Sequence, residues 1–263
     1  MIFQTVVTSF GPGGYEKYGR RFLETFIEYW PESISLIVYH EEQPDFQHPR
    51  IEFRSLWDVE YIVPFLDRIS KDERAKGVLQ IDGKKVYSYR FDVFKFSRKV
   101  FSIYDAAKRH QGILAWVDAD VVTHSNIPKD FLTSLLPSHC YTAYLGRPNN
   151  YSECGFMVFN TMHKNNILFM EVYRNCYLRL GFYDLAEWHD SFIFDHVTRL
   201  IPVTTHNLST GVPDSNNHPF INSVLGNYMD HLKGPKAKSE GRSDDEELVL
   251  KKQQSYWNND STA

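Results

Sequence analysis

The chain has 263 residues, of which 42% are hydrophobic and 15% aromatic, enough for one large domain with a sizeable core. A formal net charge of −4, without a run of lysine or arginine, excludes the basic surface that nucleic-acid binding requires. No stretch approaches the roughly 18 apolar residues of a membrane span, and MIFQTVVTSFGPGG lacks the basic start of a signal peptide. We therefore expect a cytoplasmic protein that neither spans a membrane nor binds nucleic acid.

Strands and helices are predicted from apolar runs, from helical spacing of apolar residues and from turn residues. In chain order they are a strand at 2–8, a helix at 15–30, strands at 33–39 and 50–56, a helix and a loop within 65–83, a helix at 91–110, a strand at 113–117, a helix at 127–137, strands at 140–146 and 155–160, and helices at about 163–180 and 187–198. Such alternation predicts an α/β fold with a mostly parallel central sheet flanked by helices.

We place this single domain at residues 1–237, because no linker divides the stretch. Residues 238–263 contain SEGRSDDEE and are expected to form a polar, solvated tail that is partly helical.

Two aspartates, Asp118 and Asp120, follow the apolar run at 113–117. Ligands of open α/β sheets bind beyond the carboxyl ends of the strands. Carboxylates at positions i and i+2 of a strand can face the same way, and together they suit Mg²⁺ or Mn²⁺. The alternative is a turn aspartate and a helix-capping aspartate, because D-x-D triplets are common.

The segment WVDADVV resembles the D-x-D element of GT-A fold glycosyltransferases, which hold a nucleotide-sugar diphosphate through a divalent metal. Four other stretches resemble the same fold in the same order: VVTSFGPGGYEKYG, YRFDVFKFSRK, ECGFMVFN and HLKGPKAK. The last is similar to the H-x-x-G-x-x-K element of glycogenin-like retaining enzymes, although Ala237 stands here where Pro-Trp often follows the lysine. The resemblance implies one Rossmann-like GT-A domain and a hexosyltransferase-like activity.

The resemblance also implies a set of site residues. The metal, Mn²⁺ or Mg²⁺, would be held by Asp118, Asp120 and His231. The donor, expected to be a UDP-sugar, would contact Thr8, Ser9, Tyr15, Arg90, Lys95, Asp118, Gly234 and Lys236. We assign Arg98 and Lys99 to the solvated face of their helix.

The resemblance also implies a carboxylate beside the transferring sugar, and the candidates for this catalytic role are Glu153 and Asp190. A retaining reaction needs no strong base, whereas an inverting one would use Asp190 or Glu153 to deprotonate a carbohydrate or other acceptor hydroxyl. For Asp190, in EWHDSF, a helix cap is the structural alternative.

Three other functions stay open at this point. A nucleotidyltransferase would show a glycine-rich basic loop after the first strand, of which GPGGYEKYG is a poor version. A phosphatase of the haloacid-dehalogenase type would share D-x-D-x-[TV], but at the end of its first core strand. A sugar- or nucleotide-binding module without catalysis is the third.

Overall fold

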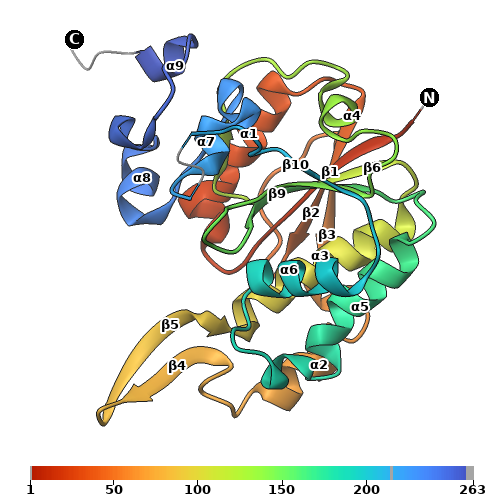
Figure 1. Ribbon diagram of the computed structural model, residues 1–263, viewed down its shortest axis with the longest axis vertical. Coiled ribbons are helices and arrows are strands. Elements are labelled where there is room, and N and C mark those ends of the chain that lie inside the picture. The colour runs from red at the N-terminus through yellow and green to blue at the C-terminus, as the bar shows by residue number, and fades with distance from the viewer. Residues whose placement is uncertain (1, 214–215, 259–263) are drawn as a thin grey trace.

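A computed structural model describes residues 2–213 and 216–258; residues 259–263 of the predicted tail lie outside the described part. Its centre is a seven-stranded sheet of strand order β10-β8-β9-β6-β1-β2-β3 (Figure 1). In that order the strands cover Thr205–Asn207, Thr142–Leu145, Glu153–Asn160, Ile113–Val117, Gln4–Phe10, Ile34–His40 and Ile51–Ser55. Two separate strand pairs are β7 (Val121–Thr123) with β11 (Met229–His231), and β4 (Lys76–Ile81) with β5 (Lys84–Asp92).

The α-helices are α1 (Arg20–Tyr29), α2 (Ile62–Ile69), α3 (Val93–Arg109), α4 (Phe131–Leu135), α5 (Asn166–Leu178), α6 (Asp190–Leu200), α7 (Pro219–Asn222), α8 (Gly234–Glu240) and α9 (Ser255–Asn258). Short π or 3-10 turns are η1 (Tyr15–Gly19), η2 (Leu56–Asp58), η3 (Gly181–Asp184), η4 (Val224–Asn227) and η5 (Asp245–Glu247). Within the described residues, none of these helices has the length and apolar character needed to cross a membrane.

Most strand pairs of the central sheet are parallel. β1 pairs in parallel with β2 and β6, as do β2 with β3 and β8 with β10. Only β9 runs antiparallel to its two neighbours in this sheet, β6 and β8. The predicted α/β fold with a mostly parallel central sheet flanked by helices is confirmed.

Alternate residues of the buried strands supply two separate cores. Val7 and Leu114 pack with α2, α3, α5 and α6, whereas their neighbours Val6 and Ala115 pack with α1, α4 and α7. Figure 1 shows these two helix groups on opposite faces of the sheet. Burial of each Val or Leu side chain contributes about 1.5–3 kcal/mol, so continuous apolar runs are what a sheet covered on both faces requires.

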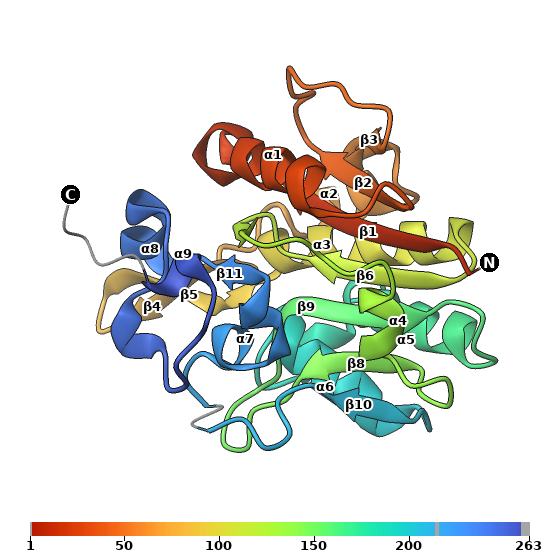
Figure 2. The same cartoon turned by 90° about the horizontal axis from the view of Figure 1, so that it is seen from above.

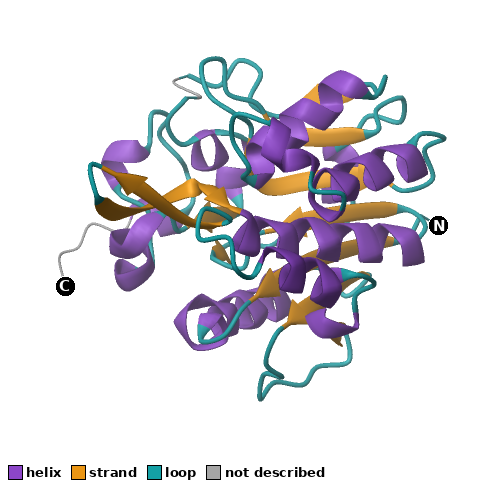
Figure 3. Cartoon of the chain, turned by 90° about the horizontal axis from the view of Figure 1, so that it is seen from below, coloured by secondary structure: helices purple, strands orange, loops and turns teal. Residues whose placement is uncertain are grey.

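The predicted helix and loop within 65–83 match α2 and the residues after it, but the β4–β5 hairpin was not predicted. Asp82 and Gly83 both have positive φ, 49° and 74°, which is the geometry of a two-residue hairpin turn. The hairpin projects from the helices (Figure 3). Figure 2 places it at the same end of the molecule as α8, the end toward which β1 runs. The carboxyl end of the sheet therefore lies between hairpin and C-terminal segment.

The C-terminal segment 238–258 is partly helical, as expected, and most of its residues are exposed, but it packs on the body through buried side chains such as Trp257. Trp257 is 6% exposed, and its indole Nε1 donates a 2.7 Å hydrogen bond to the Gly226 carbonyl. The Tyr256 ring stacks on His124 with 4.1 Å between centroids. The packing of these two large rings attaches to the body a segment whose composition is otherwise polar.

Replacing Trp257 by alanine is expected to lower the free energy of unfolding by about 3–5 kcal/mol, the usual cost of deleting a buried Trp side chain. Urea unfolding of both proteins measures the difference. Trp57 is 41% exposed and provides the matched control, since Trp57→Ala is expected to cost clearly less. Equal losses in the two variants would show that Trp257 stabilises the fold no more than a half-exposed tryptophan does.

Candidate functional site

Asp118 and Asp120 lie in a tight turn at the carboxyl end of β6. The Asp118 amide donates to the Gly155 carbonyl at 2.9 Å, and the Val121 amide donates to the Asp118 carbonyl at 3.0 Å. Ala119, between the two aspartates, is 4% exposed and belongs to the core on the α1 side of the sheet. The turn therefore buries the small residue and presents both carboxylates outside the sheet edge.

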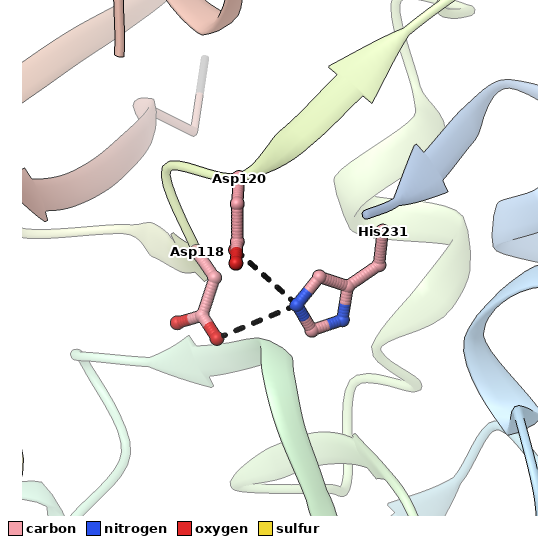
Figure 4. A group of neighbouring side chains, drawn as sticks. All are labelled: Asp118, Asp120 and His231. Carbon is pink, nitrogen blue, oxygen red and sulfur yellow. Dashed lines mark ion pairs between the residues drawn. The ribbon is translucent and has the colours of Figure 1, made fainter. Parts of the chain in front are cut away.

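His231 reaches the aspartates through the small β7–β11 sheet. β11 runs antiparallel to β7 with His231 opposite Val121, and the Leu232 amide donates to the Asp120 carbonyl at 3.0 Å. The imidazole Nε2 lies 3.3 Å from Asp120 Oδ1 and 3.8 Å from Asp118 Oδ2 (Figure 4). Strand pairing thus brings together residues more than a hundred positions apart.

These three side chains fit a divalent cation. One ligand atom from each of Asp118, Asp120 and His231 lies within 4.8 Å of the other two. Ligand atoms about 2.1 Å from Mg²⁺ in an octahedral shell are roughly 3–4 Å apart, so small side-chain shifts would close the site. The two carboxylate oxygens suit Mg²⁺ or Mn²⁺, and the imidazole nitrogen favours a transition metal, so the set fits Mn²⁺ better than Mg²⁺.

Gly155 on β9 allows the imidazole to lie this close. A Cβ at Gly155 would lie 2.6 Å from His231 Cε1 and 2.9 Å from Glu153 Oε1, closer than carbon side chains pack. Glu153 Oε1 accepts from the Gly155 amide at 3.0 Å and lies 3.4 Å from His231 Nδ1, while Lys233 pairs with Oε2. Glu153 therefore lies behind the candidate metal ligand, in the position from which a carboxylate can orient an imidazole.

Lys99 is buried at the centre of the site, which corrects its assignment to a solvated helix face. Its Nζ lies 3.0 Å from Asp118 Oδ1 and 2.7 Å from Asp190 Oδ2, and it donates to the Cys154 carbonyl at 2.6 Å. Arg98 also turns inward and lines the cleft. Every residue of α3 from Lys99 to Ala107 is buried, because the helix lies between the sheet and other helices.

Lys238, and not Lys236, approaches the aspartates. Lys238 Nζ lies 2.7 Å from Asp120 Oδ2, whereas the exposed Lys236 pairs with Asp244 at 2.6 Å. Residues two apart on an α-helix point in nearly opposite directions, so α8 can present only one of the two lysines to the site. The contact of Lys236 with a phosphate stays a prediction, as does that of the exposed Gly234.

Each aspartate divides its two oxygens between a lysine and the imidazole. Asp118 gives Oδ1 to Lys99 and Oδ2 to His231, and Asp120 gives Oδ2 to Lys238 and Oδ1 to His231. The lysines therefore bind the carboxylate oxygens that point away from His231. The oxygens that face the imidazole are the ones a cation would use.

Charge is balanced within this cluster when His231 is protonated. Four carboxylates face three lysines: Asp118, Asp120, Glu153 and Asp190, against Lys99, Lys233 and Lys238. Burial lowers the pKa of His231, but the Asp120 and Glu153 carboxylates outweigh it and raise that pKa to about 10. A metal ligand must be a neutral imidazole, so a bound cation would take the place of this proton.

A cleft of 640 Å³ opens beside the aspartates, within the size range of small-molecule sites. The predicted residues that line it are Ser9, Lys95, Asp118, Asp120 and Asp190. Those that do not line it are Thr8, Tyr15, Arg90, Glu153, Gly234, Lys236 and His231. Thr8 is fully buried in β1. Arg90, on strand β5 of the hairpin, forms an ion pair with Glu187, which lies before α6. Lining residues that the sequence did not suggest include Tyr18, Trp116, Lys99 and Lys238.

Asp190 is the first residue of α6 and is 5% exposed. Burial raises the pKa of this carboxyl, but the Lys99 ammonium outweighs it, and the pKa lies below its usual value. The carboxylate is therefore ionised and directed at Lys99 on the floor of the cleft. The start of α6 has no side-chain cap from His189, the residue before it.

The chain matches no family model and no curated protein. Solved structures similar to it include apo mouse xyloside xylosyltransferase 1, at 11% identity and a TM-score of 0.49, over 78% of this chain and 85% of that one. Apo glycosyltransferase GlyE of Streptococcus pneumoniae TIGR4 has 12% identity and a TM-score of 0.46, over 79% of this chain. The bifunctional glycosyltransferase WbbM has 13% identity and a TM-score of 0.46, over 89%.

This chain spans 46% of the GlyE chain and 46% of the WbbM chain. With identities of 11–13% and TM-scores below 0.5, these likenesses establish no shared activity. The described residues themselves define an α/β protein with a candidate divalent-cation site at the carboxyl end of its sheet.

Proposed function

We propose that this protein is a metal-dependent glycosyltransferase that moves a sugar from a nucleotide diphosphate donor to an acceptor hydroxyl. The observation that carries the proposal is the convergence of Asp118, Asp120 and His231 beside a cleft that also contains Lys99 and Lys238. The order of sequence elements that resemble GT-A enzymes supports it. A diphosphate is a polyanion, and this site offers a cation position flanked by two ammonium groups.

Mn²⁺ or Mg²⁺ would be held by Asp118 Oδ2, Asp120 Oδ1 and His231 Nε2. When bound, the cation neutralises negative charge on the departing diphosphate. With a neutral imidazole and a divalent cation, the cluster carries a net positive charge. That excess favours an anionic donor, for which we propose a UDP-sugar.

The transfer joins the acceptor oxygen to the anomeric carbon and breaks the bond from that carbon to a β-phosphate oxygen. The diphosphate leaves with the electron pair, and the acceptor proton passes to one of its oxygens if configuration is retained. An inverting reaction would send that proton to Asp190. We propose retention, because a carboxylate whose pKa is lowered by Lys99 is a weak base toward an acceptor hydroxyl.

Glu153 takes a different role from the one its sequence position suggests. Its carboxylate is occupied by Lys233, the Gly155 amide and the His231 ring. We assign Glu153 as a positioning residue for the imidazole, and Asp190 as the carboxylate beside the reacting sugar.

Incubation of the full chain with Mn²⁺ and a panel of UDP-, GDP- and ADP-sugars tests the proposal. We expect release of nucleoside diphosphate from a UDP-sugar and loss of that release with EDTA. Pyrophosphate release from a nucleoside triphosphate and a sugar phosphate would indicate a nucleotidyltransferase. Phosphate release from monoesters would indicate a phosphatase, and binding without turnover a non-catalytic module. Each of these results contradicts the proposed transfer.

Lys238→Ala is expected to lower donor turnover by about 10-fold or more, because a charge-assisted contact contributes about 1.5–3 kcal/mol. Lys236→Ala, on the opposite side of α8, is expected to retain most of the activity. Steady-state kinetics with the donor found above compare the two variants. The reverse order of effects would show that α8 turns to present Lys236 when donor is bound.

A further inference from the structure

Aromatic side chains from four parts of the chain surround His189 outside the cleft. The ring centroids of Tyr89, Phe96, Tyr151 and Phe192 lie 5.6, 6.0, 5.3 and 6.4 Å from that of His189. They come from β5, from α3, from the loop before β9 and from α6. Tyr89 is 52% exposed, whereas His189 beneath it is 4% exposed. The cluster thus has a buried base, three half-buried rings and the exposed ring of Tyr89.

Glu187 supplies a polar centre for this aromatic cluster. Its Oε1 lies 3.0 Å from Arg90 and accepts a hydrogen bond from the Tyr151 hydroxyl at 3.5 Å, while Oε2 lies 2.9 Å from His189 Nε2. The Glu187 side chain is 12% exposed and that of Arg90 is 55% exposed. The charges of the carboxylate and the guanidinium therefore cancel, and the exposed guanidinium still offers hydrogen-bond donors at the surface.

The aromatic cluster continues into the cleft of the proposed transferase. His189 directly precedes Asp190, whose carboxylate lies on Lys99 in the cleft. Phe96 belongs to both, since it lines the cleft and packs against His189. A molecule that rests on the cluster would therefore meet the cleft at Phe96.

We propose that Tyr89, Tyr151, Phe192, Arg90 and Glu187 form the acceptor subsite and take a pyranose ring of a saccharide. This inference rests on the proposed function. Aromatic faces bury the apolar C–H face of a sugar ring, and the polar groups at the edge bind its hydroxyls. The neutral Arg90–Glu187 pair favours an uncharged sugar over a phosphate or a nucleotide.

The test uses the full chain with Mn²⁺, the active donor and a panel of neutral p-nitrophenyl glycosides of the common hexoses and pentoses. We expect the wild type to glycosylate at least one of them. Tyr89→Ala should raise the acceptor KM by about 10-fold, with a much smaller effect on the donor KM, because the aromatic face under the sugar ring is lost. Tyr89→Phe keeps the ring and should restore the acceptor KM.

Tyr61→Ala is the matched control, since Tyr61 is 50% exposed and does not line the cleft. An acceptor KM that is the same in wild type, Tyr89→Ala and Glu187→Gln would overturn the proposal. So would donor turnover without transfer to any glycoside, which would indicate a protein or other acceptor.

Ligand-observed NMR of glycoside binding in the absence of donor tests the saccharide subsite independently of the proposed transferase activity. Binding that depends on Tyr89 supports the saccharide subsite even if no donor is turned over, and then only the transferase assignment fails. If the wild type binds no glycoside, the subsite is overturned whatever the donor result.

Discussion

Asp120→Ala is expected to reduce metal-dependent release of nucleoside diphosphate by about 10³-fold or more, because one preorganised charge-stabilising group is typically worth about 10²–10³ and the metal also depends on this ligand. The variant should fold, since Asp120 lies after β6 and outside both cores. Mn²⁺ binding followed by electron paramagnetic resonance gives a readout that does not depend on turnover, and the affinity should fall with the activity.

Asp67→Ala controls for the loss of a negative charge, because Asp67 is an exposed residue of α2. It should bind Mn²⁺ and turn over donor like the wild type. If Asp120→Ala kept full Mn²⁺ affinity and turnover, the metal site would have to lie elsewhere.

Lys99→Met is expected to remove donor turnover and to lower the free energy of unfolding by about 3–5 kcal/mol, the cost of leaving a buried charge without its partner. The Lys99 and Asp190 side chains are 9% and 7% exposed, so water cannot replace the lost ammonium. Urea unfolding gives the stability, and nucleoside diphosphate release gives the activity.

The double variant Lys99→Met/Asp190→Asn separates the two effects. Neutralising Asp190 removes the unpaired buried charge, so part of the lost stability should return while turnover stays low. If the double variant were no more stable than Lys99→Met, the ion pair would not be the source of the loss. Wild-type stability in Lys99→Met itself would contradict the buried pair.

The local pattern of apolar residues was sufficient to predict most strands of the central sheet. The apolar runs that became β1, β2, β6 and β9 are recognisable without tertiary information, since a strand covered on both faces must be apolar throughout. The position of Asp118 and Asp120 followed from the same pattern, because the apolar run at 113–117 ends directly before them. Even the missed β4–β5 hairpin carried a local signal, the Asp82–Gly83 turn.

Other features depend on partners far away in the chain, and only the tertiary structure decided them. Lys99 looks like any surface lysine until its helix is placed under the carboxylates of Asp118 and Asp190. The choice of Lys238 over Lys236 depends on the rotation of α8 about its axis, which packing sets and composition does not. Residues 238–258 read as a solvated tail because charge is visible in a sequence, whereas the pocket that buries Trp257 is assembled from segments distant in sequence. The periodicity of a sequence indicates which residues of one helix or strand are buried. An ion pair or a packing contact between two elements depends also on where the second element lies.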